Sequence, residues 1–286
     1  MFRIANGGLA KLAAIRASNP LTKNGSISPR VASHRHLIAT TSGKSPFNSW
    51  SRYMMAQEIN VAVTGNEPIL DFGYNSSRLV LDALPELITR EGKKNIHVRK
   101  LAQDSLDTYT DVRSVSRKVW AGKRKDFLPK PDAGDEDTTI DIDFVVHLGM
   151  ELREETFGLE TQARRDVYDK PGSDGKYLGT NPFIEKGLPE VLKTSFDVHA
   201  AWEKVHKQFP DTPCFVSDDA GSYFCEFRLY SSLAEALEHH EDKKGKVLFL
   251  HVPKKRDPEA IQFAAALAVA YFKAVADDKV LTDTNA

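Results

Sequence analysis

Acidic residues are absent from the first 57 positions of this 286-residue chain, cysteine is scarce, and no long apolar run occurs. The two cysteines, Cys214 and Cys225, exclude a disulfide-stapled scaffold and a zinc ribbon. No stretch approaches the roughly 20 apolar residues of a membrane span, which excludes an integral membrane protein. A hydrophobic fraction of 41% is too high for a disordered chain. Most of the sequence is therefore expected to form a globular fold.

Because acidic residues are absent from positions 1–57, the net charge of this segment differs from that of the rest of the chain. Residues 1–57 hold eight basic side chains, and the first acid is Glu58. Subtracting these eight from the 39 basic residues leaves 31 against 40 acidic ones, a net charge of −9 for the rest. A body of this charge does not suit nucleic acid as a partner, because phosphate binding needs a basic face.

Three interpretations fit residues 1–57. The segment is rich in Arg and Ser and free of acids, as mitochondrial transit peptides are. It could equally be a disordered tail, or translation could start at Met54 or Met55, which we favour because Met55 lies just before the first predicted strand. We therefore treat 58–286 as one domain and expect a cytoplasmic protein, with a mitochondrial location as the alternative if the basic segment is a transit peptide.

Strands and helices alternate along residues 58–286. This order predicts βαβ units in a single-domain α/β fold: a three-layer α/β/α sandwich around a mostly parallel, twisted open sheet. Asn75, Asp197 and Asp257 are suited to begin helices, the last with Pro258 at the first position. We expect a charged surface loop at 122–141 and irregular structure at 150–196. The predicted strands are 59–64, 95–101, 144–148, 214–216 and 247–252, and the predicted helices are 75–88, 112–119, 197–209, 220–237 and 257–276.

A cysteine and a histidine follow two of these strands. Sites in such sheets gather where strands end, here at 64–70, 147–151, 217–225 and 251–253. Cys225 falls in the first turns of a helix, where unpaired N–H groups stabilise a thiolate. His251 ends its strand and could take the thiol proton and later protonate a leaving amine. A carboxylate would orient the imidazole, but spacing does not select one of the 40 acids. The competing interpretation makes Cys225 a small core residue, as we expect for Cys214.

The segment Ser217–Cys225 resembles the cysteine signature of the pyroglutamyl peptidase I family, Ser-x-x-Ala-Gly-x-Tyr-x-Cys. The segment Phe249–Pro253 is similar to the family's Phe-x-His-Val-Pro motif. Eleven residues beyond Gly149, Glu160 stands where the family places its glutamate. The likeness runs in consistent order from residue 59 to about 275.

This resemblance implies a cysteine peptidase that removes N-terminal pyroglutamate (5-oxoproline) from peptides. By it, Cys225 is the nucleophile, His251 the general base and acid, and Glu160 the residue that orients His251. It implies no metal ligands, no cofactor, and peptides with a blocked N-terminus as partners, with self-association left open. The substrate-binding residues that it implies are Asn66, Ile69, Met150 and Phe224.

The chain departs from the family at the substrate loop. The family pattern Gly-Phe-x-Pro-Phe, whose aromatics clamp the oxoproline ring, is replaced by Gly65-Asn66-Glu67-Pro68-Ile69. A lost aromatic contact costs about 1–3 kcal/mol of binding. Restoring both rings by Asn66→Phe and Ile69→Phe is then expected to raise hydrolysis. The alternative is a paralogue that binds or trims a different blocked N-terminus, or one that is not catalytic.

The basic segment yields a first prediction. A chain shortened to begin at Met55 should unfold at an unchanged temperature, because residues 1–54 offer no periodic apolar face to bury. Thermal denaturation of the full and shortened chains measures this. A large drop on shortening would show that the segment docks on the folded body.

Overall fold

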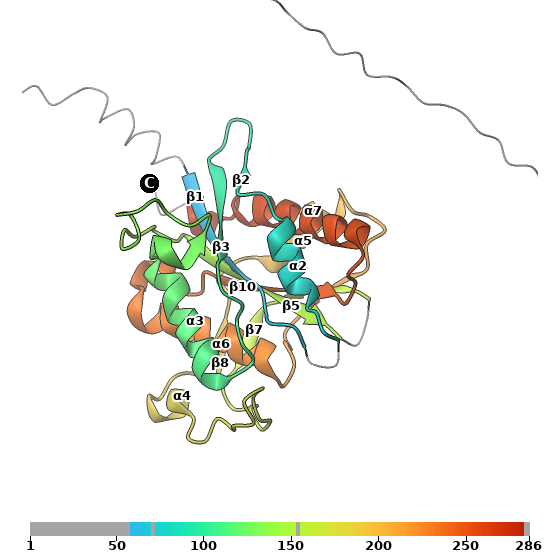
Figure 1. Ribbon diagram of the computed structural model, residues 1–286. Helices are drawn as coiled ribbons and strands as arrows, with labels where there is room; N and C mark the ends of the chain where they lie inside the picture. Colours follow the sequence, from blue (N-terminus) through green and yellow to red (C-terminus); the bar gives the residue numbers. More distant parts are fainter. Residues whose placement is uncertain (1–57, 70–71, 153–154, 283–286) are drawn as a thin grey trace, which may run out of the picture. The chain divides into compact units, whose positions relative to one another are not determined.

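The computed structural model describes residues 58–69, 72–152 and 155–282. The predictions about residues 1–57 lie outside these ranges. Eight strands form one sheet in the order β2-β3-β1-β5-β10-β6-β9, with β4 also paired to β3 (Figure 1). The four central strands are parallel: β1 (Glu58–Thr64), β3 (Asn95–Leu101), β5 (Phe144–Glu151) and β10 (Val247–Pro253). This confirms the prediction of a mostly parallel sheet in an α/β domain.

The remaining strands of the sheet run antiparallel to these central strands. β2 (Leu87–Ile88) and β4 (Phe127–Leu128) pair antiparallel with β3. β6 (Phe157–Glu160) is antiparallel to β10, and β9 (Cys214–Ser217) is parallel to β6. A second, two-stranded sheet joins β7 (Gln162–Arg164) to β8 (Val191–Lys193).

Helices cover both faces of the large sheet (Figure 1). One face packs against α2 (Ser76–Ala83), α5 (Val198–His206) and α7 (Pro258–Val275). The other packs against α3 (Tyr109–Ala121) and α6 (Phe224–His239). Along β10 the side chains alternate between the two cores, because successive strand residues point to opposite faces: Leu248 and Leu250 join the first, Val247 and Phe249 the second.

Side-chain caps begin the helices where the sequence predicted. Asn75 accepts from the Ser77 N–H, Asp197 from the Ala200 N–H, and Asp257 from the Ala260 N–H. Each cap satisfies one of the N–H groups that a helix start leaves unpaired. Such a cap typically contributes about 1 kcal/mol of stability.

Three parts of the prediction were wrong. The helix predicted to reach residue 88 ends at Ala83, because Pro85 disfavours a helical residue before it and Leu84 is extended. The loop 122–141 contains a short 3-10 helix (Arg124–Asp126) and β4. The segment 150–196 is not irregular: besides β6, β7 and β8 it contains the four-residue helix α4 (Pro182–Glu185). These short elements are set by partners far away in sequence, which local periodicity does not reveal.

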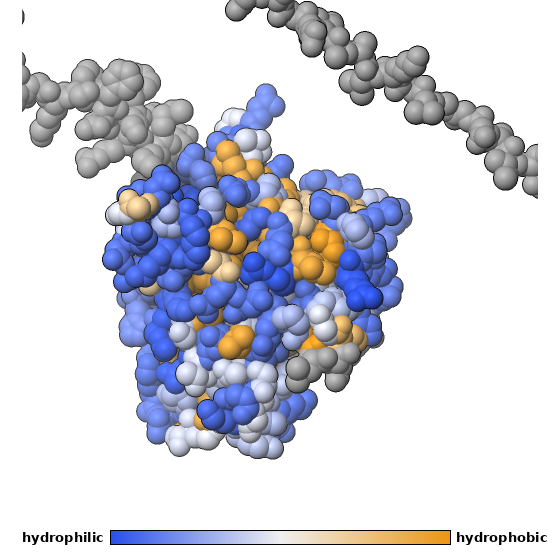
Figure 2. Space-filling model, in the orientation of Figure 1, coloured by the Kyte–Doolittle hydropathy of each residue, from blue (hydrophilic) through white to orange (hydrophobic). Residues whose placement is uncertain are grey.

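Charged and polar side chains cover most of the face shown in Figure 2, with small apolar patches between them. Within the described ranges, no helix has the length and apolar character needed to cross a membrane.

Candidate active site

Glu160 and His251 meet on adjacent strands. β10 lies between β5 and β6, so that His251 is opposite Gly149 on one side and Gly158 on the other. Glu160, at the end of β6, places Oε1 2.8 Å from Nδ1 of His251. Both side chains are buried. The pairing predicted for these two residues is therefore present in the structure.

Cys225 is the third side chain of the site, after Glu160 and His251. It is the second residue of α6, and its side chain lies close enough to the His251 imidazole to raise the pKa of that ring. Because Nδ1 of the ring is paired with Glu160, Nε2 is the ring nitrogen that is left for the sulfur. The structure thus brings Glu160, His251 and Cys225 together.

The charge of the imidazole is set by its two partners. Burial alone would lower the pKa of His251, but Cys225 and Glu160 raise it to about 10. The ring is therefore protonated at neutral pH. An imidazolium beside a sulfur at a helix start is the arrangement that activates cysteine nucleophiles.

Cys214 has a different environment. It lies on β9, partly buried, and is a free cysteine like Cys225. Burial, together with the charge of Glu160, raises the pKa of Cys214 to about 12. It therefore remains an uncharged thiol at neutral pH, as expected for an unreactive cysteine.

Two glycines make room for the pair of Glu160 and His251. A Cβ added to Gly149 would lie 2.6 Å from the Phe249 ring and 3.1 Å from Cδ2 of His251. A Cβ on Gly158 would lie 2.6 Å from the Phe215 ring and 3.2 Å from Oε1 of Glu160. Neither position accepts a side chain without moving these neighbours.

The loop before α6 brings Cys225 to His251 by a route that the sequence did not indicate. We expected residues 217–225 to follow a strand ending at the same edge as the others, but β9 runs antiparallel to β10. Ser217 pairs with Glu160. The chain then turns at Gly221, whose φ of +98° favours glycine, and α6 begins at Phe224 rather than at 220.

Arg164, which no sequence motif singles out, holds this loop. Its Nε donates to Oε1 of Glu226 at 2.9 Å, its Nη2 donates to the Gly221 carbonyl at 3.0 Å, and it forms an ion pair with Asp219. The partners are 55 to 62 positions away in sequence. No local pattern could have selected Arg164 from the 39 basic residues.

A cavity of about 520 Å³ opens over Cys225 and His251. Met150, predicted to bind substrate, lines it, and Tyr223, 41% exposed, forms an aromatic part of its wall. The ammonium of Lys170 lies 5.7 Å from the centre of the Tyr223 ring. The lining residues are Met150, Glu151, Leu152, Lys170, Pro171, Ala220, Gly221, Ser222, Tyr223, Cys225 and His251.

The other three predicted substrate residues do not line this cavity. Phe224 is buried against Tyr109, with ring centres 4.8 Å apart. Asn66 is buried and donates from Nδ2 to the Leu148 carbonyl. Ile69 is partly buried and pairs through its backbone with Tyr74. The expectation that a phenylalanine at position 66 adds a contact in the cavity therefore loses its basis.

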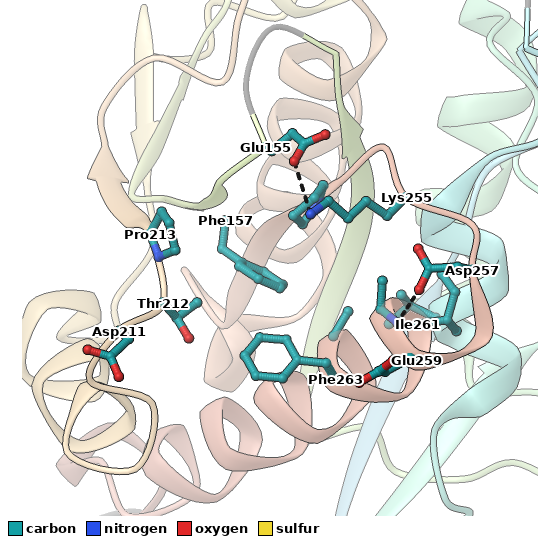
Figure 3. A pocket seen from close by; sticks show the side chains of 14 residues that line it. Glu155, Phe157, Asp211, Thr212, Pro213, Lys255, Asp257, Glu259, Ile261 and Phe263 are labelled. Atoms are coloured by element: carbon teal, nitrogen blue, oxygen red, sulfur yellow. Dashed lines mark hydrogen bonds and ion pairs between the residues drawn. The ribbon is translucent and has the colours of Figure 1, made fainter. Parts of the chain in front are cut away.

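A second cavity, of about 380 Å³, lies beside α7 (Figure 3). Phe157 and Phe263 form part of its apolar wall, and the ion pair of Lys255 with Glu155 spans 2.9 Å nearby. None of its lining residues is a cysteine or a histidine. It therefore offers neither a thiol nor an imidazole.

A cysteine at a helix start, paired with an imidazole that a carboxylate orients, is typical of cysteine hydrolases. No family model matches the chain. Pyroglutamyl-peptidase 1 of Rattus norvegicus is 30% identical over 208 residues, 72% of this chain and 85% of the rat protein, and that of Homo sapiens has the same identity and coverage. This chain belongs to the pyroglutamyl peptidase I family. The resemblance found in its motifs is thereby confirmed.

More distant relatives agree. Pyrrolidone-carboxylate peptidase of Pyrococcus furiosus is 27% identical over 139 residues, 47% of this chain but only 61% of its own length. The crystal structure of pyrrolidone carboxyl peptidase from Fervidobacterium islandicum AW-1 has a TM-score of 0.56 at 21% identity, over 76% of this chain and 99% of that one. The enzyme from Thermococcus litoralis gives 0.56 at 16% identity, over 79% and 96%. These structures support the fold.

The glycine beside Glu160 yields a second prediction. Gly158→Ala should push Glu160 away from His251, because the new methyl group meets Phe215 and Glu160. The imidazolium then loses its partner, and alkylation of Cys225 by iodoacetamide at pH 7 should slow about tenfold.

Gly92→Ala is the matched control. Gly92 has a φ of +67° with nothing within 4 Å of an added Cβ, so the change strains only the backbone, by about 1 kcal/mol. Alkylation in this control should be unchanged. An unaltered rate in Gly158→Ala would contradict the positioning assigned to Gly158.

Proposed function

We propose that this protein is a cysteine peptidase that removes an N-terminal pyroglutamyl residue from peptides. The observation that supports the proposal most strongly is that His251 contacts both Glu160 and Cys225, and that Cys225 and His251 line a cavity of about 520 Å³. Family membership supports the same reaction, because the rat and human relatives are named pyroglutamyl-peptidase 1.

In the proposed reaction, the Cys225 sulfur attacks the acyl carbon of the N-terminal 5-oxoproline. The peptide C–N bond breaks as a thioester forms, and His251 gives its Nε2 proton to the leaving amine. His251 then takes a proton from water, and the resulting hydroxide equivalent attacks the thioester. Free 5-oxoproline leaves and the Cys225 thiolate is restored. Glu160 holds the ring in place throughout.

The start of α6 supplies donors for the oxyanion. The first backbone hydrogen bond of the helix runs from the Phe227 N–H to the Tyr223 carbonyl. The N–H groups of residues 224–226 precede it, and Tyr223 provides no side-chain cap. These donors and the helix dipole stabilise negative charge on the acyl oxygen beside Cys225.

The proposed substrates are peptides with a blocked N-terminus, and no step requires a metal or an organic cofactor. The cellular compartment remains a prediction: we expect the cytoplasm, with the mitochondrion as the alternative.

The loss of both clamp aromatics favours a second candidate function, that of a peptidase for a different blocked N-terminus. Comparing pyroglutamyl, acetyl and formyl peptides as substrates separates the two.

The pH profile gives a third prediction. The protonated form of His251 is present below its pKa and is lost as the pH rises through about 10, so the alkaline limb of kcat/KM should lie near pH 10. The charge of Glu160 raises that pKa, and Glu160→Gln should therefore move the limb to lower pH while reducing the rate. A limb that stays in place would contradict the role of Glu160.

The two cysteines give a fourth prediction. Cys225→Ser should reduce hydrolysis of a fluorogenic pyroglutamyl amide by a factor of about 1,000 or more, because an alcohol is not activated by this imidazolium. Cys214→Ser is the matched control and should retain activity. Iodoacetamide should label Cys225 before Cys214. Equal labelling of both cysteines in the folded protein would favour a binding protein over a peptidase.

A further inference from the structure

The segment that follows β6 is bonded to the loop that precedes Cys225. The N–H and Oγ1 of Thr161 donate to the Ser217 carbonyl at 2.8 and 2.9 Å. Nε2 of Gln162 donates to the Asp218 carbonyl at 3.1 Å. One stretch of chain therefore carries on from the strand that holds the orienting carboxylate and fixes the loop that leads to the proposed nucleophile.

Arg164 adds charged contacts to this link. Its guanidinium bonds Glu226, Asp219 and the Gly221 carbonyl, and its backbone N–H donates to Oε1 of Glu226 at 2.7 Å. The Gly221 N–H in turn donates to Oδ1 of Asp219 at 3.0 Å. Hydrogen bonds between charged groups are about twice as strong as neutral ones. One side chain thus holds both the turn before α6 and the first turn of the helix.

The buried carboxylate of Glu226 depends on Arg164 for a counter-charge. The Glu226 side chain is fully buried, whereas that of Arg164 is 36% exposed. In the described part of the chain, Oε2 of Glu226 has no hydrogen-bond partner. Burial raises the pKa of Glu226, and the bonds from Arg164 oppose that rise. A buried carboxylate without a cation would also repel a thiolate on the preceding residue, Cys225.

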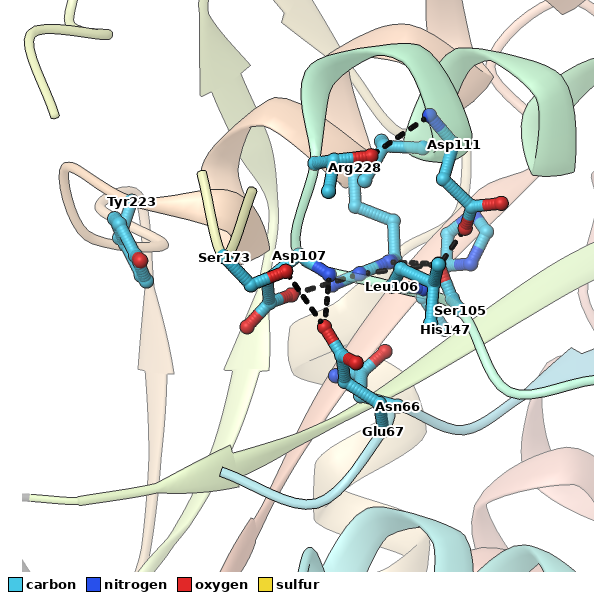
Figure 4. A network of polar contacts seen from close by, with 12 residues as sticks. Asn66, Glu67, Ser105, Leu106, Asp107, Asp111, His147, Ser173, Tyr223 and Arg228 are labelled. Atoms are coloured by element: carbon cyan, nitrogen blue, oxygen red, sulfur yellow. Dashed lines mark hydrogen bonds and ion pairs between the residues drawn. The ribbon is translucent and has the colours of Figure 1, made fainter. Parts of the chain in front are cut away.

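The body of α6 is held by other contacts. Arg228 donates from Nε and Nη2 to Oγ of Ser105 at 3.2 and 3.1 Å, and from Nη2 to Oδ1 of Asp107 at 3.0 Å (Figure 4). The Arg228 side chain is fully buried. None of these bonds involves Arg164 or Glu226. Loss of Arg164 should therefore release the turn before α6 while the rest of the helix stays in place.

We propose that Arg164 is a positioning residue for the reaction, which holds the Cys225 sulfur at the imidazole of His251. It does so through two arms: one reaches Glu226, next to the cysteine, and the other reaches the turn at 219–221. Arg164 does not line the cavity, so it acts through these partners and not on the substrate. This inference rests on the proposed function, but the reactivity of the sulfur tests it without a substrate.

The test measures the rate at which iodoacetamide alkylates Cys225 at pH 7. Arg164→Met removes both arms and should slow this alkylation about tenfold or more. It should lower kcat for a fluorogenic pyroglutamyl amide about 100-fold, because small misplacements of reacting groups are costly. The slowing of alkylation should shrink as the pH rises to 9.5, because hydroxide then ionises a thiol without an imidazolium. A change that only weakened the fold would lower the unfolding temperature without this dependence on pH.

Two further variants separate position from charge. Glu226→Gln keeps the size of the side chain and an acceptor for Arg164, so alkylation should change less than about threefold. Arg164→Met combined with Glu226→Gln leaves no buried charge uncompensated, so this double variant should fold even if Arg164→Met alone does not. The turn at 219–221 is still released in the double variant, and its alkylation should remain about tenfold slower than in the wild type.

Arg165→Met is the matched control. Arg165 is the next residue in the chain, forms an ion pair with Asp166 at 2.7 Å and donates to the Leu188 carbonyl. Neither partner belongs to the loop or to α6. Alkylation and hydrolysis should therefore both proceed at the wild-type rate in this control.

Two results would overturn the inference. Wild-type alkylation in folded Arg164→Met would show that the sulfur is placed without this arginine. Wild-type alkylation in the double variant would show that Arg164 only compensates the charge of Glu226. A wild-type protein that cleaves no pyroglutamyl amide would instead refute the proposed function, while the alkylation rates would still decide whether Arg164 places the sulfur.

Discussion

The hydrogen bond between Nδ1 of His251 and Oε1 of Glu160 is the contact on which the rest of the site depends. It exists because β6 runs antiparallel to β10 and places Glu160 opposite Phe249, two residues before His251. Gly149 and Gly158 on either side leave space for the ring and the carboxylate. With Nδ1 paired to Glu160, Nε2 is left for Cys225, and the buried imidazole keeps its proton at neutral pH.

The first turns of α6 connect this contact to the rest of the molecule. Cys225 pairs with His251, Glu226 with Arg164, and Arg228 with Ser105 and Asp107. Each pair ties the helix start to a different segment: the central sheet, the small β7–β8 sheet and the loop before α3. A short stretch of one helix thus positions the proposed nucleophile and the loop before it.

Sequence patterns predicted much of this. The alternation of Val and Ile in β1, the apolar run of β5 and the caps at Asn75, Asp197 and Asp257 are local signals, and the elements they predict are present. The cysteine and histidine motifs are contiguous, so they could be recognised without knowledge of the fold. Glu160 could be chosen only through the family resemblance, because 40 acids compete for the role.

What the sequence could not predict depends on long-range pairing. The direction of β6 and β9, the clamp by Arg164 and the burial of Asn66 and Phe224 all arise from contacts across many tens of residues. Arg228 shows the limit most clearly: in the sequence it is one of 39 basic residues, and only the structure places its side chain in the core. Cys225 is the residue proposed to carry the acyl group, and mass spectrometry of protein quenched during turnover of a pyroglutamyl amide tests this most directly. We predict a pyroglutamyl thioester on Cys225 alone; turnover with no acyl group on Cys225, or with the group on Cys214, would contradict the role of Cys225 as the nucleophile.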